Sequence, residues 1–192
     1  MSAKENTRLK ILMGTLKILG EEDVRSITVR RIAQETGVNI ALIQYHFGSK
    51  EKLIEESLSY FGNKMSGMID ATNITEDDPA GQLGNFIFSF VKQLTTFPGF
   101  TRSIMFRFMK GQKVPAKAYE NIEKSRINLF NILKRLKPEL SDEIIQLQVF
   151  QMMSSIMYPI LLDKGIKTFM GSDLKNDKDW KEYTKVLLKT YL

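Results

Sequence analysis

The chain lacks cysteine altogether and has only one histidine and one tryptophan in 192 residues. Without cysteine there can be no disulfide, no thiolate metal site and no cysteine nucleophile. The sequence also has no glycine-rich phosphate loop, and no carboxylate stands at a local spacing that would orient its single histidine, His46, as a base. We therefore expect a protein that is not an enzyme and that holds no metal and no cofactor.

Long apolar runs are scarce as well. Residues 144–162 form the one stretch of membrane-spanning length, but it carries five polar side chains, Gln146, Gln148, Gln151, Ser154 and Ser155. Near the N-terminus, Lys10 and Lys17 interrupt the apolar residues at helical spacing, which a signal peptide does not do. We expect a buried helix at 144–162 and a cytoplasmic protein.

The net charge of +6 invites a nucleic-acid interpretation, but its distribution weakens that argument. Residues 1–60 hold nine Lys or Arg and eight Asp or Glu, so their balance is only +1. Overall basicity is therefore no reason to expect DNA binding by the N-terminal region.

Helical periodicity dominates what is present, and the sequence predicts an all-α protein of about nine helices. Only Phe86–Val91 is ambiguous with a strand. Asp78 before Pro79, and Ser141 after Pro138, are predicted helix starts. A turn-rich acidic stretch at 72–79 separates an N-terminal from a C-terminal group of helices. The first predicted helix ends near residue 19. The others span roughly 28–37, 39–47, 49–71, 79–97, 98–111, 115–136, 141–164 and 175–192.

Two of these helices are short and are joined at Gly37, which is the pattern of a helix-turn-helix over about 28–47. Thr28 is a plausible N-cap, and Gly37 supplies the positive φ of the turn. Ile43 and Phe47 lie four residues apart on one face and should pack inward. Ala41, Leu42, Tyr45 and His46 then point outward, with Gln44 at the margin. Such a face suits phosphate and base-edge contact, although an ordinary solvated surface is the plain alternative.

The stretches Thr28-Val29-Arg30-Arg31-Ile32-Ala33, Gly37-Val38-Asn39 and Tyr45-His46-Phe47-Gly48-Ser49-Lys50-Glu51 resemble the N-terminal signature of TetR-family transcriptional regulators. The resemblance is dense over roughly residues 8–55, and beyond residue 60 it extends only to length and an all-helical plan. It implies a DNA-binding domain at 1–48, an effector-binding and dimerisation domain at 49–192, and a linking helix at 49–71.

The resemblance also assigns DNA-binding residues. Thr28 and Arg30 would hold phosphates, and Lys50 would clamp another from the start of the next helix. The complete predicted set is Thr28, Arg30, Arg31, Asn39, Ile40, Ala41, Gln44, Tyr45, His46 and Lys50. Arg31 could equally be a solvated helix residue.

The recognition helix departs from the common pattern because residues 39–47 contain no Arg or Lys. The usual arginine–guanine contact is therefore absent from it. We expect discrimination to depend on Gln44, on contact of Ala41 or Leu42 with thymine methyl groups, and on DNA shape.

One helix-turn-helix makes few contacts, so useful specificity implies a homodimer on two half-sites. The last two helices are the expected interface, because the stretch 144–162 is apolar on more than one side and the final helix is amphipathic. The expected interface residues are Phe150, Tyr158, Trp180, Tyr183, Leu187 and Tyr191. The alternative is that both helices pack wholly inside a monomer.

The C-terminal region is rich in Met and Phe, which fill irregular cores as readily as they line pockets. The resemblance favours a pocket for a small-molecule effector of unknown identity. Its candidate lining is Phe86, Phe90, Arg102, Met105, Phe106, Met109, Met153 and Met157. A surface arginine lying over its own stem is the alternative for Arg102.

Together these features predict a double-stranded-DNA-binding transcriptional regulator, a ligand-responsive repressor that acts as a homodimer on a palindromic operator. It would be cytoplasmic, and on the bacterial nucleoid when bound to its operator. The competing hypothesis is a helical protein-interaction module that reuses the helix-turn-helix head, residues 1–48, without binding DNA.

Overall fold

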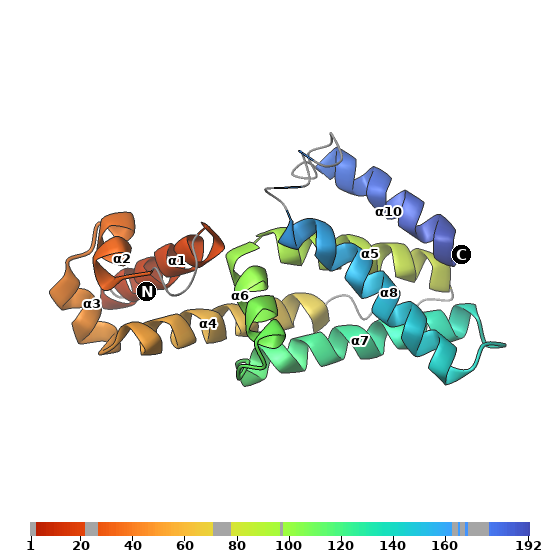
Figure 1. Cartoon of the computed structure of the whole chain (residues 1–192), viewed down its shortest axis with the longest axis horizontal. Coiled ribbons are helices and arrows are strands. Elements are labelled where there is room, and N and C mark those ends of the chain that lie inside the picture. The colour runs from red at the N-terminus through yellow and green to blue at the C-terminus, as the bar shows by residue number, and fades with distance from the viewer. Residues whose placement is uncertain are drawn as a thin grey trace. The chain divides into compact units, whose positions relative to one another are not determined.

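The computed structural model describes residues 3–21, 27–70, 78–96, 98–162 and 177–192, together with Gly165 and Thr168. These parts form nine helices and no strand (Figure 1). The all-α prediction is confirmed, and Phe86–Val91 is helical. The helices are α1 (Ala3–Glu21), α2 (Val29–Thr36), α3 (Ile40–Phe47), α4 (Lys50–Asp70), α5 (Pro79–Thr96), α6 (Pro98–Met109), α7 (Ala116–Leu136), α8 (Asp142–Leu161) and α10 (Asp177–Tyr191).

Short side chains start several of these helices as predicted. The carboxylate of Asp78 accepts from the backbone N–H of Gly81 at 3.0 Å, and Pro79 is the first residue of α5. Ser141 caps α8 by accepting from the N–H of Ile144 at 3.4 Å. Each cap satisfies an amide that the helix itself leaves without an acceptor. Helix α1 continues to Glu21, two residues beyond the end expected near residue 19, and the turn expected at 72–77 lies outside the described residues.

The chain divides into two compact units, and α4 and α7 each pass from one to the other. The first unit consists of residues 1–64 and 97–119, and the second of residues 65–96 and 120–192. The first unit therefore contains α6 as well as the helix-turn-helix. The functional boundary expected at residues 48 and 49 stays a prediction.

In the first unit, α1 packs against both α2 and α6. The approach of α1 to α2 is closest at Gly14, where a Cβ atom would stand 2.3 Å from Cγ2 of Thr36. Arg107 of α6 ties this unit together further, because its guanidinium lies 3.1 Å from the Glu55 carboxylate of α4 and donates to the carbonyl of Lys113.

In the second unit, α5 packs against α10 and α8. Gly84 of α5 faces Leu188 of α10, with an ordinary contact distance of 3.6 Å for an added Cβ atom. The Tyr183 hydroxyl donates to the carbonyl of Ser155 at 2.7 Å, which joins α10 to α8. Burial of this phenol raises its pKa above the usual value.

Helix α8 is the one described helix that is long and apolar enough to cross a membrane. Length and composition alone are weak evidence of a membrane span, because the core helix of a soluble protein meets the same criterion. One face of α8 is buried, through Ile145, Val149, Met152 and Ile156. That pattern supports the prediction of a core helix.

Candidate nucleic-acid interface

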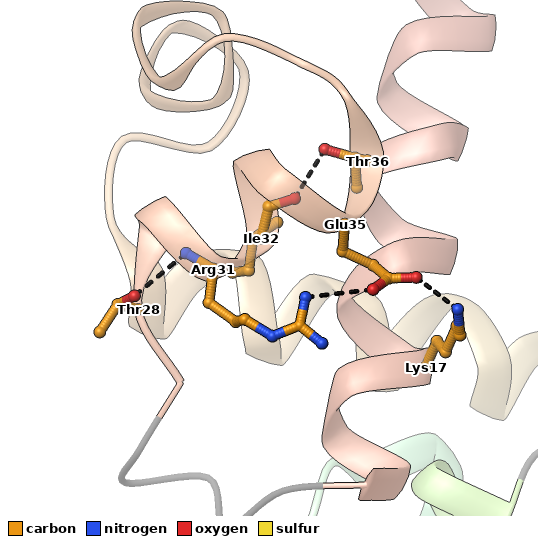
Figure 2. Close-up of polar contacts among 6 residues, drawn as sticks. All are labelled: Lys17, Thr28, Arg31, Ile32, Glu35 and Thr36. Carbon is orange, nitrogen blue, oxygen red and sulfur yellow. Dashed lines mark hydrogen bonds and ion pairs between the residues drawn. The ribbon is translucent and has the colours of Figure 1, made fainter.

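Local contacts define both ends of α2. Thr28 has extended backbone angles and accepts from the N–H of Arg31 at 3.1 Å, as Figure 2 shows. At the other end Gly37 adopts φ 62°, the left-handed conformation that favours glycine. The hydroxyl of Thr36 donates to the carbonyl of Ile32 at 2.8 Å, so this buried group is satisfied within its own helix. The predicted N-cap and C-terminal glycine are confirmed.

The following helix, α3, is only eight residues long and is closed at both ends. Asn39 caps it by accepting from the N–H of Leu42 at 3.0 Å, and Gly48 ends it with φ 75°. Ile43 and Phe47 are both about 2% exposed, so α3 is anchored by one apolar edge.

The opposite face of α3 is open to solvent. Tyr45 is 71% exposed, whereas Phe47 two residues later is buried. His46 is half-buried, with its ring edge-on to Tyr45 at 5.4 Å between centroids. The other exposed side chains of this face are Ile40, Ala41, Leu42 and Gln44. The aromatic cluster therefore divides into a packing residue and an exposed residue, with His46 between them.

The candidate phosphate contacts flank this face. Arg30 is exposed in the first turn of α2, and Lys50 is half-buried at the start of α4, 3.8 Å from Glu51. Thr28 accepts through its oxygen as an N-cap, which leaves its hydroxyl proton available to a phosphate. Asn39 is exposed, but its amide oxygen is used in capping.

Arg31 points instead toward a carboxylate of its own helix. Its guanidinium donates to Glu35 at 3.1 Å, and Lys17 of α1 donates to the other oxygen at 2.5 Å (Figure 2). The hydrogen bond from Lys17, followed by that from Arg31, lowers the pKa of Glu35. This ion-pair network joins α2 to α1, a role that neither sequence interpretation of Arg31 had included.

Sequence reasoning also missed two contributions of α1. Gly14 permits the close approach to Thr36, and cations of the first turns lie over α3 rings: Lys4 over Tyr45 and Arg8 over Phe47. A glycine inside a predicted helix was the available signal for the first. The second left no signal, because nothing in the sequence relates residues 4 and 45.

The candidate pocket residues fall in both units, so each group is described by itself. Phe86 and Phe90 of α5 are buried in the second unit, stacked at 5.6 Å between centroids. Met153 and Met157 of the same unit are half-buried on α8. In the first unit Arg102, Met105 and Phe106 are half-buried, whereas Met109 is 71% exposed at the end of α6.

The candidate interface residues also separate into two groups. Phe150 and Tyr158 of α8 are largely exposed, at 71% and 64%. Those of α10 face inward: Trp180, Leu187 and Tyr191 are buried within the chain, and Tyr183 is half-buried with its hydroxyl bonded to α8. The α10 stripe thus packs on its own unit and leaves α8 to present the exposed apolar surface.

The first similarity to known proteins concerns the helix-turn-helix head. The sequence profile of the bacterial regulatory proteins of the tetR family matches residues 11–57, which contain α2, α3 and the start of α4. The fold of the whole chain is similar to that of HlyIIR, a hemolysin II transcriptional regulator, with a TM-score of 0.69, 20% identity and 98% of each chain covered. Residues 11–57 match the helix-turn-helix segment of the tetR family, and the chain has the fold of regulators of that family.

Other relatives agree with this assignment. The TetR-family regulator PfmR of Thermus thermophilus gives a TM-score of 0.67 at 20% identity, covering 93% of this chain and 97% of its own. The nucleoid occlusion factor SlmA of Actinobacillus pleuropneumoniae is 24% identical over 140 residues, 69% of this chain and 68% of that protein. The matched family is one of bacterial regulatory proteins, and the helix-turn-helix of this chain lies in the matched segment.

Proposed function

We propose that the chain is a TetR-family repressor that binds a palindromic operator as a homodimer and releases it when a small molecule binds. The observation that carries the proposal is the exposed face of α3, where Gln44 and Tyr45 project from a helix anchored by Ile43 and Phe47. A short helix held by one apolar edge, with its opposite face exposed, suits insertion into the major groove.

Base recognition by this face depends on few groups. Because α3 contains no Lys or Arg, Gln44 is the side chain best able to pair with adenine, and Ala41 or Leu42 meets thymine methyl groups. Binding of Gln44→Ala to randomised duplexes should relax one base position in each half-site. Gln112→Ala, an exposed glutamine beyond α6, is the matched control and should leave the preference unchanged. An unaltered preference in Gln44→Ala would remove this residue from the site.

The homodimer is supported by an exposed face of α8. Leu147, Phe150 and Tyr158 are exposed on the side opposite the buried Ile145 and Ile156. An apolar helix face of this kind is costly to leave in water, and a second copy of the same face can cover it isologously. Two heads would then read two half-sites.

The effector site is proposed in the second unit, near the stacked Phe86 and Phe90 and the half-buried Met153 and Met157. Met109 is exposed and is not carried forward. Arg102, Met105 and Phe106 stay candidates by position on α6. Helix α4 begins beside the head at Lys50 and continues into the second unit, so it is the element that can couple effector and DNA. A hundredfold loss of DNA affinity needs only about 2.7 kcal/mol of differential effector binding.

Selection of bound genomic fragments tests the proposal, since the chain should enrich palindromic sites, and their neighbouring genes would suggest the effector. A gel shift at two salt concentrations should show weaker binding at higher salt. If the folded dimer leaves palindromic duplexes unbound at low ionic strength, the proposal fails and the protein-interaction module takes its place. In the proposed role the protein acts in the cytoplasm, on the nucleoid.

A further inference from the structure

The recognition helix has no cation of its own, but α1 places one beside it. The ammonium of Lys4 lies over the ring of Tyr45, with Nζ 5.4 Å from the ring centroid. Tyr45 is the most exposed large apolar or aromatic side chain of the described head residues, and Lys4 is exposed as well. The pair therefore forms part of the surface that meets the operator.

A second contact one turn further along α1 fixes this arrangement. The guanidinium of Arg8 lies 5.3 Å from the ring centroid of the buried Phe47, and it forms an ion pair with Glu56 of α4. Lys4 and Arg8 are four residues apart on α1, so they share one helix face. The anchored Arg8 sets the register of that face, which brings Lys4 to Tyr45.

Lys4 forms no ion pair with an acidic side chain in the described parts of the chain. Its ammonium instead lies over the Tyr45 ring. An ammonium on an aromatic face restricts the ring at little cost and keeps its remaining donors directed to solvent. Beside it, the phenol O–H is a further donor. A cation and a hydroxyl held next to each other are the groups that recognise a phosphate oxygen.

We propose that Lys4 is a positioning residue for operator binding: it holds the Tyr45 ring in its DNA-facing orientation, and the ammonium and phenol together contact one backbone phosphate. This inference rests on the proposed DNA-binding role of α3. It assigns to α1 the positive charge that α3 lacks, and it makes the affinity of the head depend on a residue outside the matched segment, residues 11–57.

The experiment uses the full-length chain and the tightest duplex that the wild type selects from a randomised pool. Lys4→Met keeps the aliphatic stem and removes the charge. It should weaken binding roughly fivefold per head and lower the slope of log affinity against log salt by about 0.9 per head. Lys4→Arg should restore both, because guanidinium also stacks on the ring and contacts phosphate. Lys181→Met, the same change at an exposed site in the second unit, should alter neither.

A double-mutant cycle separates positioning from simple charge. In a Tyr45→Leu background Lys4→Met should lose most of its effect, because the ring on which Lys4 acts is gone. In Tyr45→Phe the ring remains, so the loss should persist. The inference is overturned if Lys4→Met binds with wild-type affinity and slope, or if its effect is equal in the Leu background. If the wild type itself selects no duplex, the proposed function fails first, and this outcome is distinct from both.

Discussion

The two compact units differ in how they satisfy buried polar groups. In the unit that contains the head, the hydroxyls of Thr15, Thr36 and Ser57 each donate to the carbonyl four residues earlier, at 2.7–2.8 Å. One described buried polar atom of that unit, Ser103 Oγ on α6, has no hydrogen-bond partner. In the other unit there are more such atoms, among them Gln93 Oε1, Thr184 Oγ1 and Trp180 Nε1. Gln93 lies on α5, and Thr184 and Trp180 lie on α10, the two helices that pack together in that unit.

This difference indicates that the first unit satisfies its buried polar groups more fully than the second unit does. Buried polar groups in folded proteins nearly always find partners, so each exception calls for a physical reason. A binding partner such as the proposed effector would supply donors and acceptors to the second unit. The exposed apolar face of α8 belongs to the same unit and is a second surface that the proposed function assigns to a partner. The proposed function accordingly assigns effector binding and dimerisation to the second unit.

The exposed face of α8 gives the largest expected effect. Phe150→Glu would place a charge in the centre of the proposed interface, so the dimer dissociation constant should rise about a hundredfold, or about 2.7 kcal/mol. Sedimentation velocity over a concentration series measures it. Ile127→Glu on α7, which is also exposed, is the matched control and should leave the assembly unchanged. A Phe150→Glu chain that dimerises like the wild type would move the interface elsewhere.

Two glycines give the next comparison. Gly14→Ala forces a Cβ atom to within 2.3 Å of Cγ2 of Thr36, whose hydroxyl bond to Ile32 resists rotation. The head should lose about 1–3 kcal/mol of stability. Gly84→Ala in the second unit meets Leu188 at 3.6 Å and should gain up to about 1 kcal/mol from helix propensity. Urea unfolding followed by circular dichroism measures both, and equal effects would contradict the close approach of α1 to α2.

These glycines also show what the sequence could and could not supply. The ends of α2 were predictable, because Thr28 and Gly37 act on amides and carbonyls within a few residues of themselves. The role of Gly14 was not, because it depends on Thr36, which only the fold brings to it. What covers the apolar stripe of α10 could not be predicted for a related reason. Amphipathic spacing shows that Trp180 and Leu187 are covered, but not whether their own chain or a partner covers them.

Two threonines test the polar difference directly. Thr36→Val removes a hydroxyl that donates to Ile32 and accepts from the N–H of Val38, so it should cost about 1 kcal/mol. Thr184→Val removes a buried hydroxyl that has no partner, so the free energy of unfolding should stay level or rise by up to about 1 kcal/mol. The same denaturation assay applies. Should both substitutions destabilise alike, the two units do not differ in this respect.

The smallest expected effect concerns Glu35, whose pKa is lowered by hydrogen bonds from Lys17 and then Arg31. A carboxylate with a depressed folded-state pKa stabilises the protein above its ordinary pKa of 4.5, and this stability is lost as the pH falls through the folded-state value. Glu35→Gln should therefore flatten the pH dependence of unfolding below about pH 4.5 and change little near neutrality. An unchanged acid profile would mean that the network contributes nothing to stability.

Glu35→Gln also tests whether Glu35 keeps Arg31 away from DNA. With the carboxylate replaced by an uncharged amide, Arg31 loses its ion-pair partner and becomes more available to a phosphate. Affinity for non-operator duplex should then rise slightly, with a steeper salt slope, and Glu35→Gln combined with Arg31→Gln should cancel the gain. No gain in Glu35→Gln would mean that Arg31 lies out of reach of the duplex whatever its partner. Its contribution to the head would then be its ion pair with Glu35, the carboxylate that also binds Lys17 of α1.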